Sequence, residues 1–370
     1  MTQVIDGSRA SAYGATMLQP SPEFMTNARP MAVARWLWAV ATLLVVMIVV
    51  GGITRLTESG LSITEWKPVT GAIPPLNEAQ WLAEFEAYKR IPEYSQVNAG
   101  MTLAGFKQIY FWEFVHRLLG RVIGLAYALP LLWFAVRRRI PAGYGKRLVA
   151  LLALGGLQGA IGWWMVASGL TERTDVSHLR LTVHLLVALV ILGGIVWTAL
   201  DLQALHRRPL TTGARVTPIA GVALILLFAQ LAFGALTAGL NAGHAATSWP
   251  LMGETLFPAG ALPAGAGVRE LVDNPFVVQF VHRWLAFVTA AGLLALAWQA
   301  GRIGSRAGLI VVGLTVLQIV LGIATLLTGV NIHVAVAHQL NAALLLIATV
   351  AAAHRSGMEI PVSNPAESLT

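Results

Sequence analysis

Four of the nine histidines have a placement suited to binding a metal. His116, His184, His282 and His338 each lie inside a long apolar segment, one or two helical turns from the end that the charge pattern assigns to the outer side of a membrane. Each also recurs at a matching place in the other half of the chain. An ionisable side chain is costly in hydrocarbon and usually faces the interior of a helix bundle. The four histidines are therefore predicted to lie at one depth and to have a function.

The alternative for any single one of them is a neutral imidazole that hydrogen-bonds to a neighbouring helix. Four histidines at matched depth, in pairs, favour ligation instead. Imidazoles alone can bind zinc, but a site between apolar helices with no carboxylate or thiol nearby fits axial ligation of haem iron better. Two imidazoles from each half supply both axial positions of one haem. The predicted iron ligand pairs are His116 with His184 and His282 with His338.

Arginines next to these histidines have two interpretations. Arg117 and Arg283 each follow a histidine directly, and Arg121 lies one turn beyond Arg117. A guanidinium pairs with a carboxylate in bidentate fashion, so these side chains could bind haem propionates. The alternative is a structural ion pair with an acid such as Glu113. The sequence leaves both interpretations open.

Two further histidines and a group of glycines carry weaker signals. His178 and His333 lie near the outer ends of two apolar segments, where they are either interfacial residues or secondary residues near a haem edge. Glycines within the segments, such as Gly155, Gly156, Gly159 and Gly162, are interpreted as places where helix backbones approach each other.

The composition indicates that membrane-spanning helices position these residues. Of 370 residues, 56% are hydrophobic and only 11% are charged, which is unlike an ordinary soluble domain. The net charge of +8 lies in short basic runs between apolar segments, so nucleic-acid binding is not indicated. Cysteine is absent. This excludes disulfides, thiolate-bound metal and covalently attached c-type haem.

Eight apolar segments are long enough to cross a bilayer. They run over residues 36–53, 109–136, 148–167, 179–200, 216–240, 276–300, 307–329 and 334–353.

The charge of the connections predicts the orientation. Basic residues concentrate in every second connection, for example Arg137 to Arg139 and Arg207 to Arg208. By the positive-inside rule these connections face the cytoplasm, so both termini are predicted to be cytoplasmic and the loops over residues 54–108 and 241–275 to lie outside. The predicted division is a cytoplasmic tail (1–35), a four-helix unit (36–201), a cytoplasmic linker (202–215), a second four-helix unit (216–354) and a second cytoplasmic tail (355–370).

The two halves repeat each other. Gly51, Thr54, Glu58, Gly60, Thr64 and Trp66 recur without a gap as Gly234, Thr237, Asn241, Gly243, Thr247 and Trp249. The segments 114–119 and 280–285 share Phe-Val-His-Arg-x-Leu, and 157–162 and 317–322 share Leu-Gln-x-x-x-Gly. Because each unit has an even number of spans, the copies have the same orientation in the membrane. The predicted fold is all-α and polytopic, with eight transmembrane helices as two parallel four-helix repeats.

One difference between the halves bears on chemistry. Glu58 at the outer end of the first span is matched by Asn241. A carboxylate can act as an acid or base in a proton-coupled oxidation, whereas an amide can only hydrogen-bond. The alternative is a solvated loop acid.

The same segments resemble a known family. Residues 51–62, 113–117, 248–254, 279–283 and 337–339 are similar to haem A synthases of the mitochondrial and alphaproteobacterial type, and the likeness extends from about Trp36 to His354. The resemblance implies an inner-membrane oxidoreductase that oxidises the C8 methyl group of haem O by successive hydroxylations to the formyl group of haem A, the haem of cytochrome oxidase.

The resemblance also implies residue roles. His116 and His184, with Arg117, would bind the substrate haem O, while His282 and His338, with Arg283, would bind a b-type haem cofactor. Glu58 matches the functionally important acid of the family. Other branches carry a loop cysteine pair that this chain lacks, so a mechanism that requires those thiols cannot operate here. The sequence does not identify the electron donor, and an association with haem O synthase or with further copies of the chain stays open.

Two other functions fit the histidines. A two-haem b-type cytochrome would transfer electrons and leave both haems unchanged. A haem transporter would bind haem temporarily at both sites. No matching histidine pair lies near the cytoplasmic side, however, and this argues against a path for haem across the membrane.

Overall fold

The fold consists of eight long helices, described here in a computed structural model that covers residues 27–67, 70–171, 173–209 and 213–358. The helices are α2 (Pro30–Leu56), α5 (Leu103–Val136), α6 (Gly145–Ala167), α7 (His178–Arg207), α8 (Pro218–Gly239), α10 (Pro275–Arg302), α11 (Ala307–Leu327) and α12 (Ile332–Ser356). All eight are long and apolar enough to cross a membrane. The expected all-α polytopic fold is confirmed, and each expected segment overlaps one helix over most of its length.

Several helices continue beyond the apolar segments. Helix α2 begins at Pro30, inside the expected tail 1–35, and α7 ends at Arg207, inside the expected linker 202–215. Both ends carry local signals for a helix boundary: proline suits the first helical turn, and basic side chains suit the last. Helix α12 likewise ends at Ser356. Residues 1–26 and 359–370 of the expected tails lie outside the described residues.

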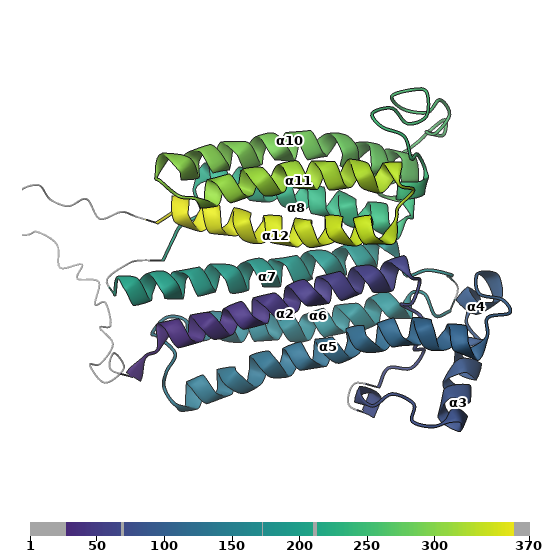
Figure 1. The fold of residues 1–370 in the computed structure, drawn as a ribbon, viewed down its shortest axis with the longest axis horizontal. Helices are drawn as coiled ribbons and strands as arrows, with labels where there is room; N and C mark the ends of the chain where they lie inside the picture. Colours follow the sequence, from purple (N-terminus) through teal and green to yellow (C-terminus); the bar gives the residue numbers. More distant parts are fainter. Residues whose placement is uncertain (1–26, 68–69, 172, 210–212, 359–370) are drawn as a thin grey trace, which may run out of the picture.

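Helices α2, α5, α6 and α7 form one bundle, and α8, α10, α11 and α12 form the other. The bundles lie side by side and meet through α2, α7, α8 and α12 (Figure 1). At this interface the Gln339 side chain of α12 donates to the Ile48 carbonyl of α2 over 2.9 Å, and it fills the space that a Cβ at Gly52 would occupy. The two halves are therefore tightly packed against each other.

A buried polar cluster links the bundles near the end where both described termini lie. The Asp201 carboxylate on α7 contacts His354 Nε2 on α12 at 2.8 Å and Arg147 on α6 at 2.6 Å. It also accepts a hydrogen bond from the Ala214 backbone nitrogen in the connection between the halves. A buried charge is tolerated only when it is paired in this way.

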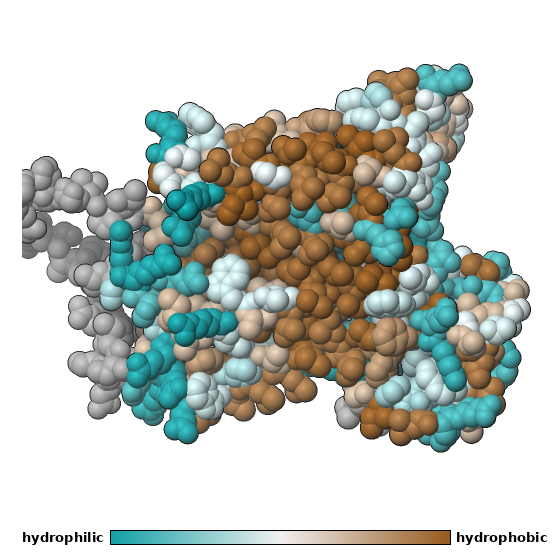
Figure 2. Space-filling view, viewed as in Figure 1, coloured by the Kyte–Doolittle hydropathy of each residue, from teal (hydrophilic) through white to brown (hydrophobic). Residues whose placement is uncertain are grey.

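The surface of the helices is apolar between two polar ends. Figure 2 shows a hydrophobic band over the middle of the bundles, with hydrophilic residues at both ends of the molecule. Large apolar side chains that would be unfavourable in water are exposed along it, such as Leu132, Ile225 and Leu309. This is the surface that a lipid bilayer covers, so the chain is a multi-pass membrane protein.

The loop between α2 and α5, which the charge pattern predicts to lie outside and which we call the first outer loop, folds into a small layer of its own. It contains α3 (Glu78–Tyr88), α4 (Pro92–Gln96) and the 3-10 helix η1 (Thr70–Ala72). An apolar cluster that includes Leu61, Phe85, Tyr88 and Phe106 packs this layer against the outer part of α5. The second outer loop is more open and contains η2 (Ala242–His244) and α9 (Glu270–Asp273). The sequence analysis did not predict these short helices.

Candidate functional site

The four histidines lie on four different helices, two in each bundle. His116 is on α5, His184 on α7, His282 on α10 and His338 on α12. All four side chains keep part of their surface accessible, as expected for residues that line a space. His116 and His184 are close enough for their charges to interact, and the same is true of His282 and His338. The fold therefore brings together the same pairs that the repeat predicts.

Each imidazole rests against a glycine of a neighbouring helix. The pairs are His116 with Gly51, His184 with Gly162, His282 with Gly234 and His338 with Gly322. In the last three pairs, a Cβ on the glycine would lie 3.0 or 3.1 Å from the ring Cε1 atom, closer than side-chain carbons normally approach. A larger residue at these positions would therefore press on the rings, which would have to shift by a few tenths of an ångström.

The glycines of α6 do not have the function that the sequence suggested. Among the described residues, no other helix comes within 4 Å of where a Cβ of Gly155, Gly156 or Gly159 would stand, so these are not places of close helix approach. Only Gly162 makes a close contact, and its contact is with the His184 ring. The interpretation of the group as helix-packing residues was therefore wrong: three of the glycines meet no other helix, and the fourth makes room for a histidine ring.

A glutamine one turn before the glycine contacts three of the four histidines. Gln158, Gln230 and Gln318 place Nε2 3.1, 3.1 and 3.2 Å from Nδ1 of His184, His282 and His338, respectively. The same amide nitrogens donate to the backbone carbonyls of these histidines over 2.9 to 3.2 Å. Each glutamine thus fixes both the ring and the backbone of its histidine.

In the sequence, Gln158 and Gln318 stand out only as part of the repeated Leu-Gln-x-x-x-Gly segments, and Gln230 lies outside that pattern because Ala229 precedes it. The signal was present, because Gln230 and Gly234 have the same Gln-x-x-x-Gly spacing. Residues four apart lie on one face of a helix. A search for that spacing, without the leading leucine, finds all three.

Two arginines join the outer loops to the histidine helices. Arg117 forms an ion pair with Glu113 and donates to the Ile63 carbonyl over 2.7 Å and to the Glu65 carbonyl over 3.1 Å. Glu113 is buried and also accepts hydrogen bonds from Ser62 Oγ and the Ile63 backbone nitrogen, both at 2.7 Å. The first loop is therefore held directly above the His116 helix.

The second half repeats this arrangement with a neutral partner. Gln279 takes the place of Glu113, and its Oε1 accepts from Arg283 over 3.2 Å. Arg283 also donates to the carbonyls of Ala246 (2.7 Å) and Ser248 (2.9 Å). Of the two interpretations from the sequence, the ion pair between Arg117 and Glu113 is present, and both guanidinium groups bind loop carbonyls.

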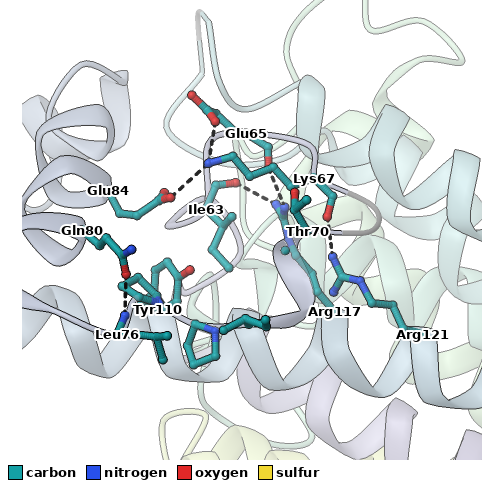
Figure 3. Close-up of a pocket in the computed structure, with 14 residues that line it drawn as sticks. Ile63, Glu65, Lys67, Thr70, Leu76, Gln80, Glu84, Tyr110, Arg117 and Arg121 are labelled. Carbon is teal, nitrogen blue, oxygen red and sulfur yellow. Dashed lines mark hydrogen bonds and ion pairs between the residues drawn. The ribbon is translucent and has the colours of Figure 1, made fainter.

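A cavity of about 390 Å³ lies under the first outer loop, beside α5 (Figure 3). Arg117, Arg121 and Tyr110 reach it from the helix, while Lys67 and Glu84 face it from the loop layer. Lys67 lies between Glu65 at 2.7 Å and Glu84 at 3.3 Å, and these carboxylates raise the pKa of its ammonium group. None of the four histidines lines this cavity, so it is separate from the histidine pairs.

Glu58 and Asn241 have the same backbone conformation. Both follow the first helix of their repeat and have a positive φ, +49° for Glu58 and +51° for Asn241. Residues other than glycine and asparagine rarely adopt this conformation. Both residues are exposed; Asn241 Oδ1 accepts from Arg55 over 2.9 Å, whereas the Glu58 side chain makes no hydrogen bond among the described residues. The repeat therefore extends to backbone geometry, and the two halves differ in the side chain at this place.

Another acid of the first outer loop, Glu93, is buried. Its residue surface is 3% exposed, and its Oε2 has no hydrogen-bond partner among the described residues. Burial, together with the negative charges of Glu113 and Asp175, raises the pKa of Glu93 to about 8. The folded protein thus keeps a proton on Glu93 at neutral pH.

The raised pKa of Glu93 predicts a pH-dependent effect of Glu93→Gln on stability. An unfolded glutamate ionises near pH 4.3, while Glu93 in the folded protein keeps its proton up to about pH 8, so the folded state is progressively disfavoured across that interval. The variant should melt at a higher temperature than the wild type at about pH 8.5, by an amount equivalent to about 2 kcal/mol or more, and at the same temperature near pH 4.5. Scanning calorimetry in detergent measures this difference.

The matched control for this prediction is Glu86→Gln in the same loop, because Glu86 is exposed and pairs with Lys89. It should shift the melting temperature little at either pH. A Glu93→Gln difference that is independent of pH would show that Glu93 is already ionised in the folded protein.

The two remaining outer histidines differ in their contacts. His178 Nε2 lies 2.9 Å from Asp273 Oδ1 on α9, so it joins the first half to the second outer loop. Burial opposes the ionisation of Asp273, but Arg269 and His178 together keep the pKa of its carboxyl below the ordinary value. For His333, the structure shows only that its backbone nitrogen donates to the Asn331 cap. Neither side chain belongs to a histidine pair.

The histidine pairs fit haem iron as a ligand set. The imidazoles are partly accessible, and each rests against a glycine, closely at His184, His282 and His338 and in ordinary contact at His116. The buried Oε1 atoms of Gln158 and Gln230 have no partner among the described residues. If either amide turned over, its Oε1 would face Nδ1 and could accept the proton that an imidazole carries there when Nε2 binds a metal.

Fold and site together define a class: a multi-pass membrane protein of two fused four-helix units, each with one partly accessible pair of histidines. Residues 34–350 match the COX15-CtaA family, described as cytochrome oxidase assembly protein, and the chain belongs to this family. Among its relatives, a protein named heme A synthase from Sphingopyxis alaskensis is 57% identical over 89% of this chain and 93% of its own length. Proteins of the same name from Rhizorhabdus wittichii and Novosphingobium aromaticivorans are 56% and 50% identical over 92% of this chain and cover 96% and 99% of their own lengths.

Proposed function

We propose that this protein is a haem A synthase that oxidises the C8 methyl group of haem O to the formyl group of haem A by successive hydroxylations. The family match and the relatives named heme A synthase support this function. The observation that carries it is one difference between the two repeated sites. Glu58 and Asn241 share one backbone conformation at the outer end of their repeats, but only Glu58 has a carboxylate.

The first pair, His116 and His184, would bind the substrate haem O, and the second pair, His282 and His338, would hold a haem b cofactor. A bound haem b supplies one-electron transfer. The protein contributes imidazole ligands at two places and closes both sites from the outer side with loops that Arg117 and Arg283 hold. These arginines would affect haem binding mainly through the loops, because Arg117 donates to loop carbonyls and to Glu113, and Arg283 donates to loop carbonyls and to Gln279. The buried Nε of Arg283 has no partner among the described residues.

Glu58 would handle protons at the first site. Conversion of a methyl group to a formyl group removes hydrogen, and a carboxylate oxygen can accept a proton and pass it to water. Glu58 lies two helical turns after Gly51, the residue against which His116 packs, and its side chain is exposed at the outer surface. An amide, as at Asn241, cannot do this.

The orientation is also part of this proposal. Both described termini lie at the end of the bundles that carries the basic connections, which the positive-inside rule places in the cytoplasm. Both haem sites would then lie toward the outer face of the inner membrane. Haem O, an electron donor and the lipid bilayer are the partners that the function requires. Haem O synthase, the source of the substrate, is a further candidate partner.

Chromatographic identification of the haems in detergent-purified protein tests this function. The protein is expressed with and without a source of haem O, and the haems are extracted and separated. Haem b together with haem O or haem A is the expected result. Two equivalents of haem b and no other haem, even with haem O available, would contradict a synthase and favour a two-haem electron carrier.

A further inference from the structure

One histidine lacks the glutamine that the other three have. Gln158, Gln230 and Gln318 each lie four residues before the glycine that cradles a histidine. At the corresponding position before Gly51, helix α2 carries Met47. A thioether has no hydrogen to donate and is a weak acceptor. Among the described residues, the His116 ring accordingly makes no hydrogen bond, and its backbone carbonyl receives none from a side chain of α2.

The Met47 side chain packs beside His116 without binding it. Its Cε atom lies 3.2 Å from where a Cβ of Gly120 would stand, one turn beyond His116 on α5. Gly120 corresponds to Ala286 in the second half. Methionine therefore has a matching space on α5, so the exchange of glutamine for methionine is accommodated by the neighbouring helix.

The His116 ring is also oriented differently. Its Nε2 and Cδ2 atoms lie nearest to Gly51, at 3.4 and 3.9 Å from a Cβ position, whereas the other three rings present Cε1 at 3.0 or 3.1 Å. A separation of 3.4 Å is an ordinary contact, and the ring is therefore not wedged in place. Its metal-binding Nε2 faces the glycine, so the ring has to turn before this nitrogen can face a haem between the helices.

The helix that carries His116 packs more loosely than its counterpart. Helix α10 lies along both α11 and α12, while α5 approaches α6 less closely and barely contacts α7. The orientation of the His116 ring, its lack of hydrogen bonds and the looser packing of α5 thus all favour movement of His116. Each difference lowers the cost of moving His116.

We infer that Met47 leaves His116 free to release the iron of the substrate haem, while His184, fixed by Gln158, keeps hold of it. This inference rests on the proposed function and goes beyond it by assigning a positioning residue. A site that must take up haem O and give up haem A needs one displaceable ligand. A permanent cofactor needs none, and both ligands of the second pair have their glutamine.

Exchange of the residues at positions 47 and 230 tests this inference. In the full-length protein with haem O bound, two readouts report ligand release: binding of carbon monoxide to the reduced first-site haem, and the rate of haem transfer to excess apomyoglobin. Met47→Gln should lower both about fivefold to tenfold, the effect of one added hydrogen bond. Met47→Leu, which has a similar size and no donor, should leave both at wild-type values. The reciprocal Gln230→Met should make the second haem bind carbon monoxide.

The outcomes separate this inference from the proposed function. If Met47→Gln and Gln230→Met both behave like the wild type while His184→Ala lowers the haem content, the ligand assignment stands and the inference is wrong. If His116→Ala and His184→Ala both leave the haem content unchanged, the ligand assignment fails and the inference fails with it. If Met47→Gln does not fold, Gln230→Met alone tests the inference, because it removes from His282 the glutamine contact that His116 lacks.

Discussion

Glu58→Gln is expected to lower the rate of haem A formation at least about a hundredfold, while the protein keeps its haem content. Acid–base catalysis by one side chain contributes about 10²-fold to 10⁴-fold to a rate, and glutamine removes the ionisable group at nearly constant size. The positive φ at this position is equally tolerable for both residues. Chromatographic measurement of haem O and haem A in cells that express the variant gives the rate and the haem content together.

Glu86→Gln is the control for this variant, since Glu86 is an exposed acid of the same loop and forms an ion pair with Lys89. It should leave haem A formation unchanged. Full activity of Glu58→Gln would show that Glu58 is a solvated loop acid, the alternative that the sequence left open. Loss of haem together with activity would instead indicate a structural function for Glu58.

The second large effect is expected for Gly234→Leu, which should remove haem b from the second site. A Cβ at Gly234 lies 3.1 Å from His282 Cε1, and the rest of a leucine side chain would occupy the space of the ring. Overpacking of this kind costs about 1 to 3 kcal/mol, which corresponds to roughly a tenfold to hundredfold loss of haem affinity. A pyridine haemochrome assay of the purified protein measures the haem that remains.

Gly313→Leu on α11 is the matched control, because Gly313 is exposed on the lipid side and no described residue lies within 4 Å of its Cβ position. It should keep the full haem content. If Gly234→Leu also kept one equivalent of haem b, His282 would not be an iron ligand in the orientation that the structure shows.

The arrangement of spans and histidines could be predicted because it depends on short-range patterns. Each span is marked by its own apolar length. His184, His282 and His338 lie about two turns after the start of their helices, whereas α5 begins at Leu103, before the expected start of its span, and His116 lies deeper along it. The Glu58 and Asn241 match, found by counting residues, reappears as a shared positive φ. Patterns of this kind can be recognised in the sequence without knowing which helices are neighbours.

The contacts between helices could not be predicted, because chain order does not determine them. That Gly162 cradles His184 and that Gln230 contacts His282 depends on which faces of two helices meet. The binding of Arg117 to loop carbonyls depends on how the first outer loop folds back, and that loop forms short helices driven by an apolar cluster of its own. A search for membrane spans does not detect these elements.

The two-fold repeat has a consequence for how such a protein can acquire two different sites. A symmetric dimer of identical four-helix chains carries every substitution twice, so a change that opens one site opens the other as well. Once both copies lie in one polypeptide, each can change alone. Met47 and Glu58 occur in the first copy, while Gln230 and Asn241 occupy the same places in the second. Fusion of the two copies thus allows each half to change at its site without changing the other.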